Sequence, residues 1–246
     1  MAISSFLDPV FSPLLNLPIL WAVILLSFFI SLIITLIYKY TTDQNLMKQL
    51  KDEMKEFQKR IKELKKEPEK AMEIQKKSMK TNMKYMGQSM KSTLYSFLPI
   101  ILIFGWMNAN FAFEPIVPGN DFTTTVVFDK NAYGEIELSV PDGILIEGPS
   151  KKEVNDGEVK WILNGERGEY LLEYIFNGKK YSKEVLIAEK QYKDPVKNIK
   201  DGTVKSIEIN NKKQIVLSII NWGWLGTYII FSIIFSIVIR KIVKVY

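Results

Sequence analysis

The stretch KKSMKTNMKYMGQSMKSTLYSFLPIILIF, residues 76–104, passes from a basic, methionine-rich segment directly into an apolar one. Its four methionines recur at steps of four, three and four residues, the spacing of one helix face: Met79, Met83, Met86 and Met90. Charged residues stop at Lys91, and residues 94–113 contain no Asp, Glu, Lys or Arg. The pattern predicts a helix that approaches a membrane and then crosses it.

Residues 17–38 and 217–239 form two further uncharged, apolar blocks. A helix needs about 20 apolar residues to cross the ~30 Å hydrocarbon core, so the three blocks predict three transmembrane helices. Residues 1–16 contain no Lys or Arg and are broken by Pro9 and Pro13. Since a signal peptide begins with positive charge, we expect this segment to be retained and to lie along the membrane interface.

The distribution of charge predicts the orientation of the chain. Residues 39–92 hold 15 basic and 8 acidic residues, whereas residues 114–216 hold 15 basic and 18 acidic ones. The tail after Ile239 holds three basic residues and no acidic residue. Because positive loops stay in the cytosol, we expect a multi-pass plasma-membrane protein with its N-terminus and residues 114–216 outside and its C-terminus inside.

The cytosolic segment between the first two spans has a heptad pattern. Apolar residues alternate between two seam positions: Met47, Leu50, Met54, Phe57, Ile61 and Leu64. Pro68 interrupts the pattern near its midpoint, because proline lacks the amide hydrogen that a helix interior requires. We therefore predict an antiparallel coiled-coil hairpin, with Met72, Met79, Met83, Met86 and Met90 as the seam of its second arm.

Two interpretations of the hairpin's side chains stay open. The methionines either join the two arms or bind varied apolar partners, for which a flexible, polarisable side chain is suited. The lysines of the second arm contact either anionic lipid or the phosphates of ribosomal RNA. The lysines in question are Lys76, Lys77, Lys80 and Lys84.

Residues 114–216 carry a different pattern, of short β-rich runs between turn residues. Six runs predict strands: TTTVVF, GEIELSV, GILIEG, EVKWIL, EYLLEYIF and KYSKEVLIA. Asn177-Gly178 is a strong signal for a type I′ hairpin turn, and Asp156-Gly157 and Asn164-Gly165 indicate further turns. The expected structure is a small extracellular β-sandwich.

Hydroxyl side chains supply most of the polar groups within the spans, which hold no charged residue. Ser27, Ser31 and Thr35 repeat every four residues and therefore share one helix face. Ser232 and Ser236 repeat the same step in the third span, and Ser96 lies near the start of the second. These residues either line a polar recess that opens to the cytosol or are small residues used for close helix packing.

The composition restricts the possible chemistry. The chain contains no histidine and no cysteine, which excludes histidine acid–base catalysis, thiolate chemistry and His/Cys metal sites. No carboxylate lies within a span. We therefore expect no enzyme, no bound metal and no cofactor.

The order of elements resembles the YidC superfamily of membrane protein insertases, and most of all its short archaeal members with three spans. The resemblance rests on TTDQNLMKQLKDEMKEFQKRIKEL and MKYMGQSMKSTLYSFLPIILIF and covers about residues 1–113 and 217–246. It implies an insertase or chaperone for nascent membrane proteins, in which the methionines hold the incoming segment, the lysines hold ribosome or lipid, and the recess admits its hydrophilic flank. The β-domain lies outside the common core, and no arginine lies in any of the three blocks.

A membrane α-helical fold with an inserted β-domain follows from these patterns. The expected parts are the interfacial segment with the first span, the hairpin, the second span, the β-domain, and the third span with its tail, at residues 1–38, 39–93, 94–113, 114–216 and 217–246. The alternative function is that of a structural or receptor protein, which displays the β-domain on an anchor linked to the coiled coil.

Overall fold

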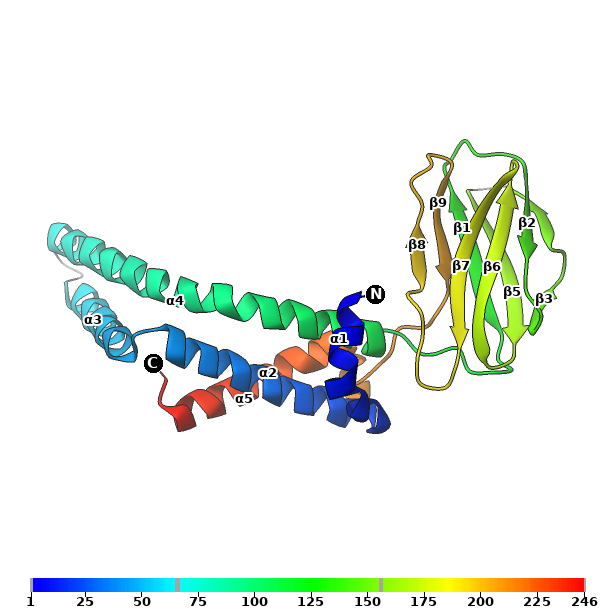
Figure 1. The fold of residues 1–246 in the computed structure, drawn as a ribbon. Coiled ribbons are helices and arrows are strands. Elements are labelled where there is room, and N and C mark those ends of the chain that lie inside the picture. Colours follow the sequence, from blue (N-terminus) through cyan, green and yellow to red (C-terminus); the bar gives the residue numbers. More distant parts are fainter. Residues whose placement is uncertain (1, 65–66, 155–156, 246) are drawn as a thin grey trace. The chain divides into compact units, whose positions relative to one another are not determined.

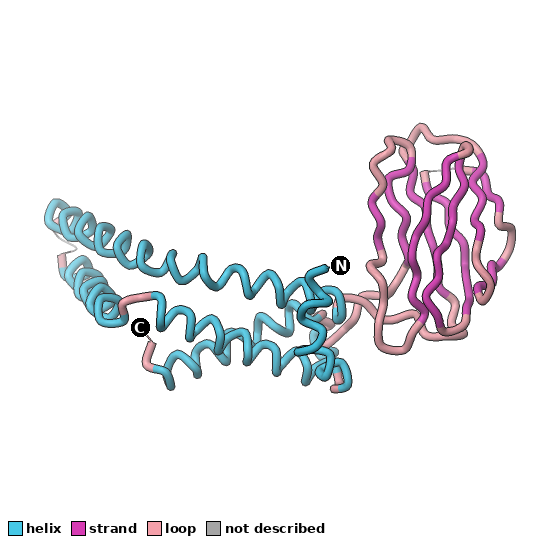
Figure 2. Tube along the Cα trace, in the orientation of Figure 1, coloured by secondary structure: helices cyan, strands magenta, loops and turns pink. Residues whose placement is uncertain are grey.

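The computed structural model of the chain describes residues 2–64, 67–154 and 157–245. The chain divides into two compact units, a helical one of Met1–Gly105 with Trp224–Tyr246 and a second one of Trp106–Gly223. Helices make up the first unit, and nearly all of the second consists of strands and loops (Figures 1 and 2). The fold is that of a membrane α-helical protein with an inserted β-domain, as the sequence predicts.

Within the described residues, five α-helices and the 3-10 helix η1 form the helical part of the chain, and Figure 1 shows how they follow one another. Among the described residues, three of these helices are long and apolar enough to cross a membrane, namely α2, α4 and α5. The helices are α1 (Ala2–Phe11), η1 (Ser12–Asn16), α2 (Ile19–Thr41), α3 (Gln44–Glu63), α4 (Pro68–Phe111) and α5 (Trp224–Val243). The three predicted spans are therefore present.

The hairpin between the first two spans consists of α3 and the first half of α4. Asp43 caps α3, since its carboxylate accepts hydrogen bonds of 3.0 Å from the amides of Asn45 and Leu46. At the other end Pro68 occupies the first position of α4, where a missing amide hydrogen costs nothing. Proline thus begins the second arm, as the interrupted heptad predicts.

The second arm and the second span are one continuous helix. α4 is 44 residues long, about 66 Å at 1.5 Å per residue, and contains Pro99 in its interior. The predicted division into a hairpin of 39–93 and a span of 94–113 is therefore not marked by any break in α4. Side chains of the second arm and of the second span therefore belong to the same helix, so spacing along α4 relates their faces directly.

The spans α2 and α5 pack side by side (Figure 1). The rings of Phe28 and Phe235 meet edge to face with their centroids 5.4 Å apart. Phe104 of α4 contacts α5 in the same way, with centroids 5.6 Å from Trp224 and 4.9 Å from Tyr228. Edge-to-face geometry suits the ring quadrupoles, so these aromatic contacts help to hold the three spans together.

The predicted third span begins later than the sequence pattern indicates. Residues 217–239 were expected to form it, but α5 begins at Trp224 and contains Arg240 and Lys241 in its last turn. The preceding residues fold as a short loop around the 3-10 helix η2 (Ser218–Ile220). Apolar composition alone does not distinguish such a loop from a helix.

The second unit contains a β-sandwich of two antiparallel sheets. One sheet has the order β3-β5-β1-β9-β8 and the other the order β4-β2-β6-β7. The strands are β1 (Phe122–Phe128), β2 (Glu135–Ser139), β3 (Ile144–Glu147), β4 (Lys151–Glu153), β5 (Glu158–Gly165), β6 (Gly168–Phe176), β7 (Lys179–Ile187), β8 (Val196–Asn198) and β9 (Val204–Ile209). The six predicted runs coincide, within one or two residues at each end, with β1, β2, β3, β5, β6 and β7, while β4, β8 and β9 were missed.

The predicted turns have mixed outcomes. Asn177 and Gly178 both have positive φ, at 48° and 76°, and join the paired ends of β6 and β7. This is the type I′ geometry that the dipeptide predicts. The prediction for Asn164-Gly165 was wrong, because both residues lie within β5 and the chain reverses after them. Asp156 lies outside the described residues.

Large apolar side chains fill the space between the two sheets. Trp161, Leu163, Leu172 and Tyr174 are fully buried, and the hydroxyls of Tyr174 and Thr124 share a hydrogen bond of 2.5 Å. Alternation along each strand directs these residues inward and the charged ones outward. The sandwich therefore has a complete core of its own.

Candidate functional site

The polar face of α2 is buried in the helical unit. Ser27, Ser31 and Thr35 are each at most 4% exposed. The Ser27 hydroxyl donates to the carbonyl of Val23 at 2.7 Å, and the Thr35 hydroxyl donates to that of Ser31 at 2.7 Å. Bonds to the carbonyl four residues earlier satisfy the hydroxyl donors within the helix itself. Each oxygen keeps acceptor capacity for a further partner.

The polar residues of α5 meet those of α2. The Ser31 hydroxyl donates to the carbonyl of Ser232 at 3.3 Å, while the Ser232 hydroxyl donates to the carbonyl of Ile229 at 2.9 Å. Ser232 and Ser236 are only partly buried. The structure therefore brings the predicted residues of the first and third spans together, with the α5 serines at the more open edge.

On α4 the predicted residue Ser96 belongs to a longer polar face. Ser96 is 5% exposed and donates to the carbonyl of Ser92 at 2.7 Å; Ser92 itself is 2% exposed. Closer to the tip, the buried Thr81 donates to the carboxylate of Glu53 on α3 at 3.4 Å. Sequence reasoning missed Ser92 and Thr81, although their spacing from Ser96 fits one helix face.

The three spans converge at the end that is close to the hairpin. The guanidinium carbon of Arg240 on α5 lies 5.1 Å from the ring centroid of Tyr38 on α2. The Tyr38 hydroxyl lies within hydrogen-bonding reach of Tyr85 and Ser89 on α4. A basic residue thus stands next to the polar faces, where α2 and α4 leave the apolar blocks. Arg240 falls one residue beyond the block that the sequence pattern assigned to the third span.

The methionines of α4 do not form the second seam of the hairpin, so that prediction was wrong. Met72, Met79, Met83, Met86 and Met90 are between 54% and 70% exposed. In contrast, Met47 and Leu50 of α3 are buried, as the heptad predicts. Ser92 follows Met90 by two residues, about 200° around the helix, so the polar face is turned inward and the methionines outward.

The exposed face of α4 continues into the apolar part of the helix. After Met90 the exposed residues Leu94, Phe97 and Ile101 follow at steps of four, three and four. We name this face the methionine track; its residues are Met72, Met79, Met83, Met86, Met90, Leu94, Phe97 and Ile101. The track gives α4 one apolar stripe that runs from the hairpin into the span.

The four predicted lysines lie exposed on α4: Lys77, Lys80 and Lys84 are beside this track, and Lys76 lies on the track face, four residues after Met72 and three before Met79. Lys80 and Lys84 each follow a track methionine by one residue, about 100° around the helix. Lys76 is similarly exposed, and Lys77 forms an ion pair with Glu73 at 2.7 Å. Positive charge therefore flanks the methionine track on one side.

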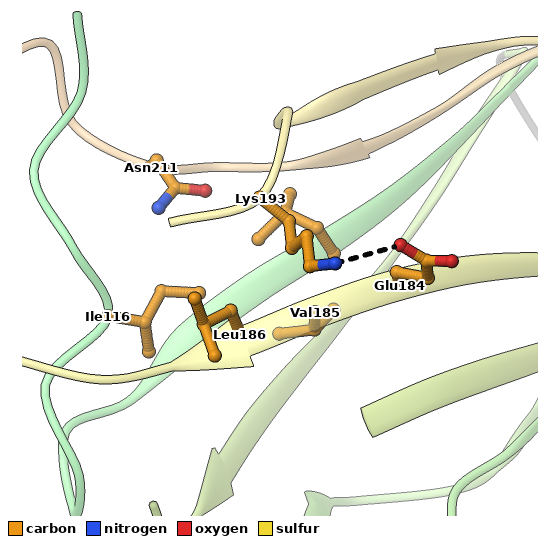
Figure 3. A pocket seen from close by; sticks show the side chains of 7 residues that line it. Ile116, Glu184, Val185, Leu186, Lys193 and Asn211 are labelled. Carbon is orange, nitrogen blue, oxygen red and sulfur yellow. Dashed lines mark ion pairs between the residues drawn. The ribbon is translucent and has the colours of Figure 1, made fainter. Parts of the chain in front are cut away.

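The charged side chains of the β-domain form ion pairs with one another. Within the described residues there is no group of three or more acidic residues, histidines or cysteines that could hold a metal. Figure 3 shows a small hollow in which the Lys193 ammonium lies 3.3 Å from the Glu184 carboxylate. Lys193 also pairs with Glu169 at 2.7 Å, and this hydrogen bond raises the pKa of Lys193.

One comparison with known proteins identifies a relationship. A family model described as "Integral membrane protein EMC3/TMCO1-like" matches residues 4–130, just over half of the chain. The matched segment contains most of α1 and all of α2, α3, α4 and the strand β1. No curated protein and no solved structure matches the chain.

Proposed function

The chain belongs to the EMC3/TMCO1-like family of integral membrane proteins, and from this premise we propose that it is an insertase for nascent membrane proteins. The family is related to the YidC insertase superfamily and is linked to membrane protein insertion. The chain is accordingly a multi-pass membrane protein. In the proposed role it receives hydrophobic segments at the hairpin and assists their transfer into the bilayer.

The methionine track is the observation that carries this proposal. Its residues Met72 to Ile101 cover about 44 Å along a single helix, at 1.5 Å per residue. Leu94, Phe97 and Ile101 lie in the apolar part of α4, where lipid covers exposed side chains, but Met79 to Met90 precede that part. Contiguous apolar surface of this kind outside a membrane commonly marks a binding site. Methionine adapts its shape to different apolar partners, so a track of this kind suits segments of varied sequence.

The continuity of α4 supports a transfer in one direction. A hydrophobic segment bound at Met79 or Met83 has apolar side chains of the same face ahead of it, at Leu94 and Phe97. Each step along the track replaces one apolar contact by another, so the segment does not have to return to water. The driving force is the burial of apolar surface, which is completed when the segment meets lipid.

The inward polar face supports passage of the substrate's hydrophilic flank. An unpaired amide in hydrocarbon costs several kcal/mol. Ser31, Thr35 and Ser96 offer hydroxyl oxygens with remaining acceptor capacity, and Ser232 and Ser236 lie at a partly open edge. We propose that this face lowers the cost of drawing polar backbone past the lipid, with Arg240 as a nearby positive charge.

The charge pattern supports the remaining parts of the proposal. We place the hairpin and the C-terminus in the cytosol and the β-domain outside the plasma membrane, by the positive-inside rule. The exposed Lys76, Lys77, Lys80 and Lys84 then lie where anionic lipid and ribosomal RNA are both within reach. The three-span architecture favours the short archaeal type, and the proposed activity is non-enzymatic and needs no cofactor.

A photo-crosslinking experiment tests the proposal. A crosslinking side chain replaces either Met83 on the track or its exposed neighbour Asn82, which lies about 100° away. We expect translating ribosomes that expose a hydrophobic segment to give crosslinks at position 83 and several times fewer at position 82. Equal crosslinks at the two positions would show that the track is not the binding face.

A pair of multiple substitutions sharpens this test. Changing Met79, Met83, Met86 and Met90 together to Ser removes the apolar track, and we expect severalfold less insertion in reconstituted vesicles. The matched change of all four to Leu keeps the apolar surface but stiffens it. We expect this variant to insert a narrower range of substrates. Normal insertion by the Ser variant would leave the receptor or anchor role as the better explanation.

A further inference from the structure

A short apolar loop precedes the third span. In residues 217–222, LSIINW, the backbone of Leu217 pairs with that of Trp222 in both directions, at 3.0 Å and 3.2 Å. The 3-10 turn of η2 lies between them, and Asn221 at φ 50° completes the reversal. We name this closed loop the apolar finger.

The tip of the apolar finger consists of uncovered apolar side chains. Ile219 is 90% exposed, Ile220 is 42% exposed and Trp222 is 41% exposed. No charged residue occurs from Gln214 to Ile239. An isoleucine held almost wholly in water forfeits the free energy of burial that its side chain offers, so the tip requires a covering surface.

Most of the finger's backbone amides are paired within the loop itself. Besides the Leu217–Trp222 pair, the amide of Val216 donates to the carbonyl of Trp222 at 2.9 Å. The amides of Ile220 and Asn221 donate to the carbonyls of Leu217 and Ser218, both at 3.4 Å. Irregular backbone meets lipid at a high cost unless its polar groups are paired. This loop therefore suits the interfacial zone of a bilayer.

The apolar part of α5 is shorter than the hydrocarbon core of a bilayer, which brings the preceding loop close to lipid. The apolar part of this helix, from Trp224 to the residue before Arg240, covers only 16 residues. At 1.5 Å per residue it spans about 24 Å, less than the ~30 Å core. Trp222 precedes Trp224 by two residues, so the chain holds it within about 7 Å of the helix start.

From these observations we propose that the apolar finger inserts into the bilayer leaflet in which α5 begins. Ile219 and Ile220 lie among the upper acyl chains, and Trp222 lies at headgroup level, the depth that indole prefers. Ser218 and Asn221 keep their polar side chains at the aqueous side. The finger supplies the apolar surface that the short helix lacks and fixes the height of the helix start relative to the membrane surface.

Depth-dependent quenching of a single fluorophore tests this proposal on the full chain. The protein contains no cysteine, so Ile219→Cys creates a unique labelling site at an exposed side chain. The protein, with a polarity-sensitive dye at this position, is reconstituted into phosphatidylcholine vesicles. The fluorescence of the dye is compared between lipid brominated in the upper acyl chain and lipid without bromine. Two matched positions are Tyr133→Cys, 84% exposed in the β-domain, and Ile234→Cys, 48% exposed on α5.

We expect brominated lipid to quench the dye at position 219 strongly and aqueous iodide to quench it about tenfold less than at position 133, because ions are excluded from the apolar zone. A dye at position 219 that behaves like the one at position 133 would place the finger in water and overturn the proposal. Protection from both quenchers would overturn it too. That result would mean that protein covers the finger, from a second copy of the chain or from a substrate.

Discussion

The two units of this protein treat their apolar side chains in opposite ways. The β-sandwich buries Trp161, Tyr174 and Phe176 between its sheets, and its surface is charged. The helical unit instead leaves Met83 and Phe97 on its outer face, both more than half exposed. The difference is that the sandwich covers its large apolar side chains by itself, whereas the helical unit leaves apolar surface uncovered, as expected of helices that face lipid.

The two units also differ in which residues their polar side chains contact. In the sandwich they link distant segments: the buried Lys183 ammonium donates to the carbonyl of Asp194, and burial lowers the pKa of this lysine. In the spans, hydroxyls such as those of Ser27 and Ser96 bond within their own helix. Such local bonds satisfy the hydroxyls within each helix, and the Ser31 hydroxyl, which donates to the carbonyl of Ser232, adds a bond between α2 and α5.

The largest expected effect concerns the core of the sandwich. Trp161→Ala removes a fully buried indole, and we expect it to cost about 3–5 kcal/mol. Denaturant unfolding of residues 112–216, followed by circular dichroism, measures this loss. In the control Tyr133→Ala, whose side chain is 84% exposed, we expect a change within about 0.5 kcal/mol. If residues 112–216 without any substitution do not fold on their own, the sandwich is not independent of the helical unit and the comparison of the two units fails.

A matched pair on α4 compares the two faces of one helix. Ser92→Leu forces a larger side chain into a buried position and should destabilise the helical unit by about 1–3 kcal/mol. Met90→Leu, two residues away on the exposed face, should leave the thermal unfolding midpoint of the detergent-solubilised protein nearly unchanged. Equal shifts for the two variants would contradict the assignment of an inner and an outer face.

Cysteine labelling tests how far the polar face opens to water. Cysteines at positions 232 and 236 lie at the partly buried edge, whereas one at position 27 replaces a fully buried serine. We expect a membrane-impermeant thiol reagent added on the hairpin side to modify the first two severalfold faster than the third. Rates at 232 and 236 as low as at Ile234, a lipid-facing control, would argue that the serines serve helix packing.

The smallest expected effect is a pH dependence in the sandwich. The hydroxyl of Tyr181 donates to the Asp201 carboxylate, and this bond lowers the pKa of Asp201 from its ordinary value of 3.8. A lowered carboxyl pKa stabilises the fold above the ordinary value, and the stabilisation is lost as the pH falls below it. We therefore expect Tyr181→Phe to lower the free energy of unfolding at pH 7 but to have progressively less effect below pH 3.8. An effect that does not change with pH would assign the role of Tyr181 to packing.

Several features of the fold follow from local sequence. Proline 68 lacks the amide hydrogen that a helix interior uses, so the position of the hairpin turn could be predicted. Asn177-Gly178 tolerates two successive positive φ angles, so the β6–β7 turn could be predicted as well. The short strands β4 and β8, of three residues each, carry too little periodicity to be recognised.

The candidate site was only partly predictable, because residue spacing shows which side chains share a helix face but not where that face points. Ser27, Ser31 and Thr35 share a face because of their spacing, and the structure buries that face. The direction of the α4 methionines could not be deduced from spacing, because an apolar stripe serves equally as a seam or as an outer surface. Packing against α3 decides which face of α4 points inward. The Thr81 hydroxyl contacts Glu53 of α3, whereas Met79 is exposed.

By itself the sequence determined the elements that depend on residues close together in the chain. These are three uncharged stretches long enough to cross a bilayer, a proline that starts the second arm, and alternating runs that form a sandwich. Only the tertiary structure decided which face of α4 points outward, and that residues 217–222 close into a finger instead of extending α5. The physical reason is that apolar composition measures how strongly a segment avoids water, while the surface that shields it is selected by packing against residues far away in the chain.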